Sequence, residues 1–428
     1  MNRPTPVGEL LQKGRQLRIL RLTPWYYHDQ VDAWPVEYDS MGGMQIQITR
    51  LSRTLAAHGV RQLVVTAGFP GLPRYHRDRD GLTVRVARAP IPPIRSELTC
   101  LVGLIPAWFA ATLTACLGIR RWKPDLVHVH ADGSMWPLLL APLAARTVGA
   151  PYVLTLHCSC LAGYLSDAGR LRQRLAAAAE RIAIRRAAQV ITLTEGTGRL
   201  VAEALDTGDE RFTVVPDFLD TEAKPAGTGR FDFAGWAAAA PGRPVIGFVG
   251  RIAHEKGWQH LVPLARRLRD LRPRFLVVGD GPQRHRLAEA IHDHGLTDDF
   301  LITGFIPNTD VPDALAVMST ALVPSAYEEL GGAALEALSA GTPVAAFGVG
   351  GLLTTVGELC PQMLVPAGDL DALEAKVRQI AADPRHFADL AAAARPTIEE
   401  RYGAPAAVRE LTTVYRRALH PDSGRDRA

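Results

Sequence analysis

The segment PVIGFVGRIAHEKGWQHLVPLARRLRDLRPRFLVVGDG, residues 244–281, places two apolar runs on either side of a helical pattern. PVIGFVG (244–250) and FLVVGDG (275–281) are apolar over most of their length rather than alternating, as expected for strands that are covered on both faces. The intervening GWQHLVPLARRLRDL (257–271) is helical in pattern. Because a strand–helix–strand unit makes a right-handed crossover between parallel strands, this segment predicts an α/β domain with a parallel sheet.

The same alternation runs through the chain in two series. The first series comprises LRILRLT (17–23), QLVVTAG (62–68), LVHVHA (126–131), YVLTLH (152–157) and QVITLT (189–194). The second adds FLITGF (300–305), TALVPS (320–325) and PVAAFG (343–348) to the two runs above. A length of 428 residues exceeds what one hydrophobic core usually supports. We therefore expect an α/β protein of two Rossmann-like domains, with parallel sheets facing across a cleft.

Composition shifts set the expected domain boundaries. Residues 1–16 are expected to form a flexible extension, 17–217 the first domain and 244–400 the second domain. Residues 218–243 are rich in glycine, proline and alanine and are expected to form the linker. Residues 401–418 are expected to form a C-terminal helix that returns to the first domain, and the polar tail 419–428 is expected to be disordered.

Charge and hydropathy exclude some classes of protein. The formal net charge of +4 is small for this length and does not indicate nucleic-acid binding. Residues 1–16 lack the apolar centre of a secretion signal, so a cytoplasmic protein is expected. LTCLVGLIPAWFAATLTACLGI (98–119) is uncharged and long enough to span a bilayer. Its proline, glycines and threonines lower its hydropathy, which favours a buried or domain-interface helix, and no stable membrane insertion is expected.

The loops that follow the strands are where ligands of open α/β sheets bind. Gly42 and Gly43 precede a helix and could admit a phosphate to the backbone, or could simply form a tight turn. Arg251 and Lys256 lie in the loop after strand 244–250, where two cations would suit a diphosphate; a solvated surface pair is the alternative. His157 ends a strand and could contact a substrate or be a satisfied buried histidine.

The most unusual loop is PSAYEELGGAALEAL, residues 324–338. Its helix begins near Leu330, Gly331 and Gly332, where free amides would face an anionic ligand. Glu336 lies about one turn inside this helix and can reach a ribose diol, and Glu328 precedes the helix and can accept hydrogen bonds from hydroxyl groups. Together the loops predict a ligand with a ribose, a diphosphate and a polyhydroxylated end, which describes a nucleotide sugar.

An ordered set of motifs carries a family resemblance. Gly-Gly-Met near the start, HVHADG, TLH, GRIAHEKG, VGDGP, GFIP, PSAYEELGGAALEAL, AGTPV and GVGG together resemble the retaining GT-B glycosyltransferases of the glycosyltransferase 4 family, over about residues 18–417. The resemblance implies that the second domain binds the sugar nucleotide and the first domain the acceptor.

The resemblance also implies residue roles. Arg251 and Lys256 would bind the donor diphosphate, and Glu336 would bind the ribose. Glu328 would bind the sugar hydroxyls and His157 would contact the reacting sugar. Backbone amides at Leu330, Gly331 and Gly332 would hold the phosphate. The family's usual Gly-Phe-Gly after the first glutamate is replaced by Glu329-Leu330-Gly331, a departure that affects the detailed sugar contacts.

Longer stretches, including PDLVHVHADG (124–133) and SELTCLVGL (96–104), are similar to 2-deoxystreptamine glycosyltransferases of aminoglycoside biosynthesis. This implies transfer of N-acetylglucosamine from UDP-GlcNAc, or of glucose from UDP-glucose, to an aminocyclitol. No cofactor or metal is expected, because none of the ligand-binding loops described above carries an Asp-x-Asp signature. A glycosyltransferase with a lipid or cell-envelope acceptor, and a sugar-nucleotide-binding regulator without turnover, are the alternatives.

The acceptor itself makes one further prediction. A diamino-cyclitol is cationic near neutral pH, so its site should hold carboxylates. The candidates are Asp29, Asp32, Glu37 and Asp39 before the Gly-Gly pair, and Asp132 after a first-domain strand. Solvated loop carboxylates are the alternative for each of them.

Overall fold

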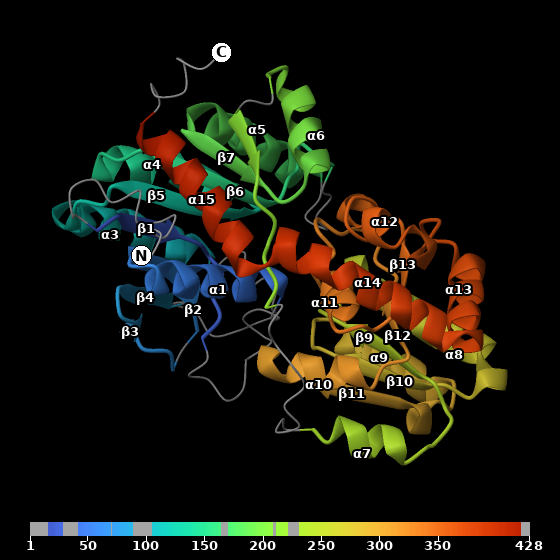
Figure 1. Ribbon diagram of the computed structural model, residues 1–428. Helices are drawn as coiled ribbons and strands as arrows, with labels where there is room; N and C mark the ends of the chain where they lie inside the picture. The colour runs from blue at the N-terminus through green and yellow to red at the C-terminus, as the bar shows by residue number, and fades with distance from the viewer. Residues whose placement is uncertain are drawn as a thin grey trace, which may run out of the picture. The chain divides into compact units, whose positions relative to one another are not determined.

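The computed structural model describes residues 16–28, 42–69, 71–88, 105–163, 170–208, 211–220 and 231–420 (Figure 1). The chain divides into two compact units. Of the described residues, the first unit contains most of those up to Asp217 together with those from Ala404 onward, and the second contains Gly42, Gly43 and those between Phe218 and Gly403. Each unit is built around its own sheet.

The sheet of the first unit has eight strands in the order β3-β4-β2-β1-β5-β6-β7-β8. The strands are β1 (Arg18–Leu22), β2 (Arg61–Gly68), β3 (Tyr75–Arg79), β4 (Leu82–Arg88), β5 (Leu126–Asp132), β6 (Tyr152–Cys158), β7 (Gln189–Thr192) and β8 (Phe212–Val214). All five strands predicted for this half are present, and β3, β4 and β8 are additional.

The first sheet is parallel, as expected, except at its edge, where β3 pairs with β4 antiparallel. The two strands are joined by Asp80-Gly81, a dipeptide typical of hairpins, and Gly81 takes a φ of 79°. β3 reads YHRDR and alternates between exposed and half-buried residues. This charged strand therefore suits a sheet edge, where charged side chains oppose pairing with another chain.

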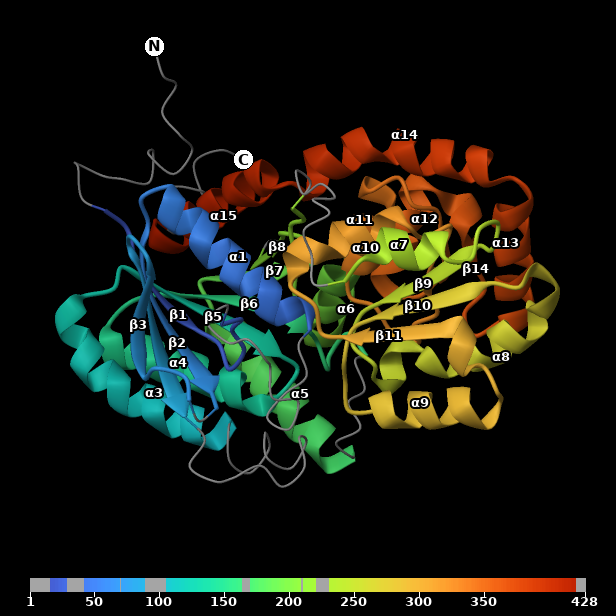
Figure 2. The same cartoon turned by 90° about the horizontal axis from the view of Figure 1, so that it is seen from below.

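Helices cover both faces of this sheet. They are α1 (Gly43–Ala57), α3 (Ile105–Ile119), α4 (Met135–Val148), α5 (Arg170–Arg186), α6 (Glu195–Leu205) and α15 (Ala404–Leu419). Figure 2 shows α1 and α15 on one face and α3, α4 and α5 on the other. α3 is the described part of the apolar stretch 98–119; it buries Trp108, whose indole Nε1 donates to the Val65 carbonyl at 3.0 Å. No helix within the described ranges is long and apolar enough to cross a membrane.

The last helix of the described residues, α15, packs on the first sheet. Its apolar side chains Val408, Leu411, Val414 and Tyr415 join one buried cluster with Ile19 of β1 and Val153 of β6. The helix therefore supplies part of the core of the first unit.

The second unit has a six-stranded parallel sheet in the order β11-β10-β9-β12-β13-β14. Its strands are β9 (Val245–Val249), β10 (Arg274–Val278), β11 (Phe300–Gly304), β12 (Thr320–Val323), β13 (Val344–Phe347) and β14 (Leu364–Val365). Counted from β9, this is the 3-2-1-4-5-6 order of the Rossmann fold. The strand order reverses between β9 and β12, which defines the edge where a ligand is expected.

The helices of this unit are α7 (Phe233–Ala238), α8 (Leu261–Arg267), α9 (Arg284–Asp293), α10 (Val311–Ala316), α11 (Gly332–Ser339), α12 (Val356–Leu359), α13 (Leu370–Ala382) and α14 (Pro384–Tyr402). α8 and α9 lie on one face of the sheet, and α10 and α11 on the other (Figure 2). The first unit has a single turn of 3₁₀ helix at Arg120–Trp122. Similar turns of the second unit lie at His254–Lys256, Trp258–His260, Arg269–Leu271, Thr297–Asp299, Asn308–Asp310, Gly350–Leu353 and Pro361–Met363. The predicted helix 257–271 is thus α8 with a 3₁₀ turn on each side.

The segment proposed as a linker, residues 218–243, contains structure that belongs to the second unit. Leu219 accompanies Phe233 of α7 in the core cluster of that unit. The Leu219 amide also donates to the Tyr402 carbonyl at 2.7 Å. The described part of this segment is therefore packed against the second unit.

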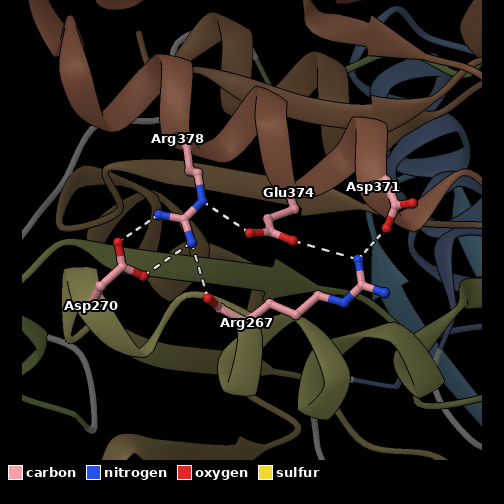
Figure 3. A network of polar contacts seen from close by, with 5 residues as sticks. All are labelled: Arg267, Asp270, Asp371, Glu374 and Arg378. Atoms are coloured by element: carbon pink, nitrogen blue, oxygen red, sulfur yellow. Dashed lines mark hydrogen bonds and ion pairs between the residues drawn. The ribbon is translucent and has the colours of Figure 1, made fainter.

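A surface network ties α8 to α13 (Figure 3). Arg378 contacts Asp270 at 2.6 and 3.0 Å and Glu374 at 2.9 Å, and Arg267 contacts both Glu374, at 3.4 Å, and Asp371. Hydrogen bonds to Asp270 and Glu374 raise the pKa of the Arg378 guanidinium. Because the network is solvent-exposed, salt screens it and it adds little to stability.

The packing of α15 makes a testable prediction. Leu411 is 2% exposed, so Leu411→Ala should destabilise the first unit by about 3 kcal/mol through lost burial and a residual cavity. Hydrogen exchange at increasing urea, measured on peptides of β1 and β6, would report the change. Arg417→Ala, an exposed position on the same helix, is the control and should leave the protection unchanged. Equal protection in both variants would contradict the assignment of α15 to this core.

Candidate active site

Two loops meet where the order of the second sheet reverses. The loop after β9 carries Arg251 and Lys256, and the loop after β12 carries Ser325 and Glu328. Lys256 Nζ lies 2.8 Å from Glu328 Oε1, and Ser325 Oγ donates to the same oxygen at 2.8 Å. The structure thus brings together a predicted diphosphate-binding cation and a predicted sugar-binding carboxylate.

Arg251 has a carboxylate partner that the sequence reasoning missed. Its guanidinium forms an ion pair with Glu255, four residues further along the same loop. Burial raises the pKa of the Glu255 carboxyl, but Arg251, a backbone hydrogen bond and Lys256 outweigh this and hold the pKa below its ordinary value. Glu255 is therefore ionised near neutral pH. Two cations and two carboxylates, Arg251, Lys256, Glu255 and Glu328, make the site close to neutral before an anion arrives.

The backbone also joins the two loops. The amide of Ala326 donates to the carbonyl of Glu255 at 2.9 Å. Gly257 has a φ of 72°, and a Cβ at this position would lie 1.8 Å from the carbonyl oxygen of Pro324. Only glycine allows this approach, so the spacing of Lys256 and Glu328 depends on Gly257.

Helix α11 begins beside these loops. Gly331 is its N-cap residue with a φ of 84°, and Gly332 is its first residue. A Cβ at Gly331 would lie 2.3 Å from Leu352 Cδ2, whereas a Cβ at Gly332 would meet nothing within 4 Å. Leu330 is buried, and Glu336 is half-buried in the second turn. The amide of Ala334 donates to the Gly331 carbonyl at 3.0 Å. Amides that precede it at a helix start have no acceptor one turn back, and the partial positive charge of the terminus favours an anion there.

The loop after β13 contacts the loop after β12 that carries Glu328. The amide of Gly351, after β13, donates to the carbonyl of Glu328 at 2.9 Å. A Cβ at Gly350 would lie 2.2 Å from that carbonyl oxygen, and one at Gly351 would lie 2.0 Å from the carbonyl oxygen of Glu329. The GVGG motif therefore lets two loops touch through their backbones, which positions Glu328.

In the first unit, His157 is the penultimate residue of β6 and is 7% exposed. Its Nε2 lies 3.0 Å from His130 Nδ1, and its Nδ1 lies 3.8 Å from Asp217 Oδ2. One ring nitrogen therefore has a hydrogen-bond partner, while the other faces a carboxylate beyond hydrogen-bond distance.

The candidates for acceptor binding are described only in part. Asp132 Oδ2 accepts from Trp25 Nε1 at 2.6 Å, and Oδ1 accepts from the Ser134 amide at 3.0 Å and from Ser134 Oγ at 2.7 Å. Asp132, the last residue of β5, is thus held by three hydrogen bonds just before α4, although a carboxylate has about four acceptor positions. Asp29, Asp32, Glu37 and Asp39 lie outside the described residues. Gly42 precedes α1 and Gly43 is its first residue, where an added Cβ would meet nothing within 4 Å.

Some residues of the site carried signals that could have been recognised. Glu255 follows Arg251 at the i, i+4 spacing that permits an ion pair. His128 and His130 alternate on an otherwise apolar strand, where buried polar groups need partners. Across the described part of the chain, no group of three or more His, Cys, Asp or Glu side chains is arranged to hold a metal ion.

The fold is that of the GT-B glycosyltransferases. Sucrose-phosphate synthase from Thermosynechococcus elongatus superposes with a TM-score of 0.76 at 21% identity, covering 95% of this chain and 100% of that one. HepE of Anabaena, solved in complex with UDP and glucose, superposes with a TM-score of 0.68 at 18% identity, covering 94% and 99%.

Sequence relatives narrow this class. Residues 42–217 match the family described as Glycosyl transferase 4-like domain, and residues 236–397 match Glycosyl transferases group 1. The chain is 52% identical over 415 residues to 2-deoxystreptamine N-acetyl-D-glucosaminyltransferase of Streptomyces fradiae, covering 95% of this chain and 98% of that protein. It is 47% identical over 384 residues to 2-deoxystreptamine glucosyltransferase of Streptomyces kanamyceticus, covering 88% and 99%. The chain therefore belongs to the glycosyltransferase 4-like family and is a glycosyltransferase that uses a nucleotide-sugar donor.

The contact at Gly257 can be tested. Gly257→Ala should push the two loops apart, separate Lys256 from Glu328 and lower turnover about 100-fold, because small misplacements of binding groups are costly. The measurement is nucleotide release from the sugar nucleotide under saturating acceptor.

Gly242→Ala is the matched control. Gly242 has a φ of 76° but nothing within 4 Å of an added Cβ, so this variant carries the backbone strain without the collision. It should lose about 1 kcal/mol of stability and keep its turnover. Equal turnover in the two variants would show that the approach of Gly257 to Pro324 does not organise the site.

Proposed function

We propose that this enzyme transfers N-acetylglucosamine from UDP-GlcNAc to 2-deoxystreptamine with retention of configuration, in aminoglycoside biosynthesis. The observation that carries the proposal is the 52% identity, along nearly the whole of both chains, to the N-acetylglucosaminyltransferase of Streptomyces fradiae. The cation and carboxylate cluster of the second unit supports the proposal, because a diphosphate requires cations and a sugar requires hydrogen-bond acceptors.

Arg251 and Lys256 are proposed to bind the donor diphosphate. Both cations already have carboxylate partners, Glu255 and Glu328, so the diphosphate takes over their hydrogen bonds when it binds. The amides at Leu330, Gly331 and Gly332 add the positive end of α11, and Gly42 and Gly43 offer bare backbone at the start of α1. Glu336 accepts hydrogen bonds from the ribose diol.

Glu328 and His157 are proposed to contact the sugar. When Lys256 turns to the diphosphate, Glu328 gains acceptor capacity for sugar hydroxyls while Ser325 continues to hold it. As the bond between C1 and the β-phosphate oxygen breaks, charge grows on the diphosphate. The preorganised cations and helix amides stabilise that charge more than they stabilise the ground state.

The acceptor hydroxyl attacks C1 from the face that UDP leaves, which gives retention. The new bond joins C1 to the acceptor oxygen, and the departing phosphate oxygen accepts the hydroxyl proton. Asp132, with Asp29, Asp32, Glu37 and Asp39, is proposed to attract the ammonium groups of the aminocyclitol.

UDP-glucose is the second candidate donor. The 47% identity to the glucosyltransferase of Streptomyces kanamyceticus, which covers 99% of that protein, supports it. The two donors differ by one acetamido group, so a direct comparison separates the candidates.

The experiment is UDP release by the purified enzyme with 2-deoxystreptamine and each donor, with mass spectrometry and anomeric NMR of the product. We expect a retained α-linked N-acetylglucosaminyl product and a higher kcat/KM for UDP-GlcNAc. A higher kcat/KM for UDP-glucose would mean that glucose, not N-acetylglucosamine, is the sugar transferred. Hydrolysis of the donor without formation of a pseudodisaccharide would exclude 2-deoxystreptamine as the acceptor.

The proposed role of Arg251 predicts a specific loss. Arg251→Gln should lower kcat/KM for the donor about 100-fold, because one charged hydrogen-bond donor to the leaving group is removed. Arg286→Gln, which removes an exposed charge from α9 of the same unit, is the control and should change kcat/KM by less than about twofold. An equal loss of kcat/KM in the two variants would mean that donor binding depends on the net charge of the second unit and not on Arg251 itself.

A further inference from the structure

A chain of polar side chains runs through the interior of the first sheet to His157. Arg21 of β1 contacts His128 and His130 of β5, and His130 contacts His157 of β6. Arg21, His128 and His130 are at most 1% exposed. Buried polar groups in a sheet core are costly unless each is paired, so this chain is unusual in a fold that otherwise buries apolar strands.

Arg21 is buried with neutral partners. Its Nε and Nη2 donate to Gln62 Oε1 at 3.3 and 3.0 Å, and its Nη1 lies 3.2 Å from His128 Nδ1 and 2.6 Å from His130 Nε2. Gln62 in turn donates to the Ser52 carbonyl at 2.6 Å, which fixes its amide oxygen toward Arg21. Within the described ranges no carboxylate forms an ion pair with Arg21.

Arginine can donate hydrogen bonds but cannot accept them. The histidine nitrogens that face Arg21, His128 Nδ1 and His130 Nε2, must therefore carry lone pairs. Burial lowers the pKa of both histidines well below the ordinary value, and the Arg21 charge lowers it further, so both rings are neutral. A neutral ring with a lone pair on one nitrogen carries its proton on the other. The proton of His130 is thus on Nδ1, and that of His128 is on Nε2, 2.7 Å from Thr155 Oγ1.

The same reasoning reaches His157. His130 Nδ1 donates to His157 Nε2 across 3.0 Å, so His157 Nε2 carries a lone pair and the neutral ring has its proton on Nδ1. This proton points toward Asp217 Oδ2, 3.8 Å away. At that separation the carboxylate attracts the N–H group without occupying it as a hydrogen-bond partner.

We propose that Arg21, acting through His130, is a positioning residue that holds His157 in one ring orientation with its proton on Nδ1. His157 then presents an N–H donor to an oxygen of the reacting sugar. This inference rests on the proposed contact of His157 with that sugar. Were the proton on Nε2, Nδ1 would carry a lone pair facing Asp217 and could accept from a sugar hydroxyl but could not donate to a sugar oxygen.

Two substitutions at position 130 distinguish the direction of the hydrogen bonds, meaning which group donates and which accepts, from the packing of the side chain. In His130→Gln, the amide oxygen can accept from Arg21 and the amide nitrogen can donate to His157 Nε2, so the sense of the chain is preserved. In His130→Leu, both bonds are lost. We expect the glutamine variant to stay within about tenfold of the parent kcat and the leucine variant to lose about 100-fold, with the donor KM little changed.

The direct measurement is ¹⁵N NMR of protein labelled at histidine, with the His157 signals assigned by their loss in His157→Gln. The parent enzyme and His130→Gln should show protonated Nδ1 and unprotonated Nε2 at His157, and His130→Leu should show a mixture. Protonated Nε2 in the parent enzyme would overturn the inference whether or not the leucine variant folds. Parent-like turnover in His130→Leu, or loss of turnover in His130→Gln with the Nδ1–H form intact, would also overturn it.

Activity of His157→Gln distinguishes this failure from that of the proposed function. If His157→Gln loses turnover while His130→Leu keeps it, His157 acts without help from Arg21 and only the positioning inference falls. If His157→Gln keeps full turnover, the proposed sugar contact falls as well.

Discussion

The contact between Lys256 and Glu328 organises the second unit as a binding site. The two residues lie 72 positions apart in sequence and follow different strands, yet their side chains meet at 2.8 Å. They meet because β9 and β12 are neighbours in the sheet although two other strands separate them along the chain. The loops that follow β9 and β12 both begin at the same edge of the sheet, where the strand order reverses. Their side chains therefore lie close together, and a few residues are enough to build the site.

The backbone around this contact explains the local abundance of glycine. Gly257 approaches the carbonyl of Pro324, and Gly350 and Gly351 approach the carbonyls of Glu328 and Glu329. Side chains at these positions would collide with backbone atoms, which cannot move away as a flexible side chain can. The glycines near the carboxylates thus serve loop-to-loop packing as well as the open helix terminus at Gly332.

The strands could be predicted from the sequence wherever they are buried on both faces. PVIGFVG and YVLTLH are continuous apolar runs, and both are strands in the structure. β3 was missed because YHRDR is charged, and β14 because it has only two residues; both depend on a neighbouring strand rather than on their own composition. In the site, Lys256 and Glu328 could be found from their loops. The partner Glu255 stands at a spacing from Arg251 that permits an ion pair. The role of Arg21 could not be predicted, because a buried hydrogen-bond chain depends on side-chain directions that spacing does not specify.

The return of α15 to the first unit has a consequence for how the chain is made. The core around Ile19 and Val153 is completed by Leu411, Val414 and Tyr415, which follow the whole of Phe218–Gly403 in the chain and leave the ribosome after it. The second unit, in contrast, is almost one continuous stretch, Phe218–Gly403. During synthesis the second unit can fold before α15 is made. Until then, the apolar face of the first sheet that α15 covers is exposed to solvent and to chaperones. A premature stop codon before α15 would therefore leave the first unit, which is encoded first, without part of its hydrophobic core.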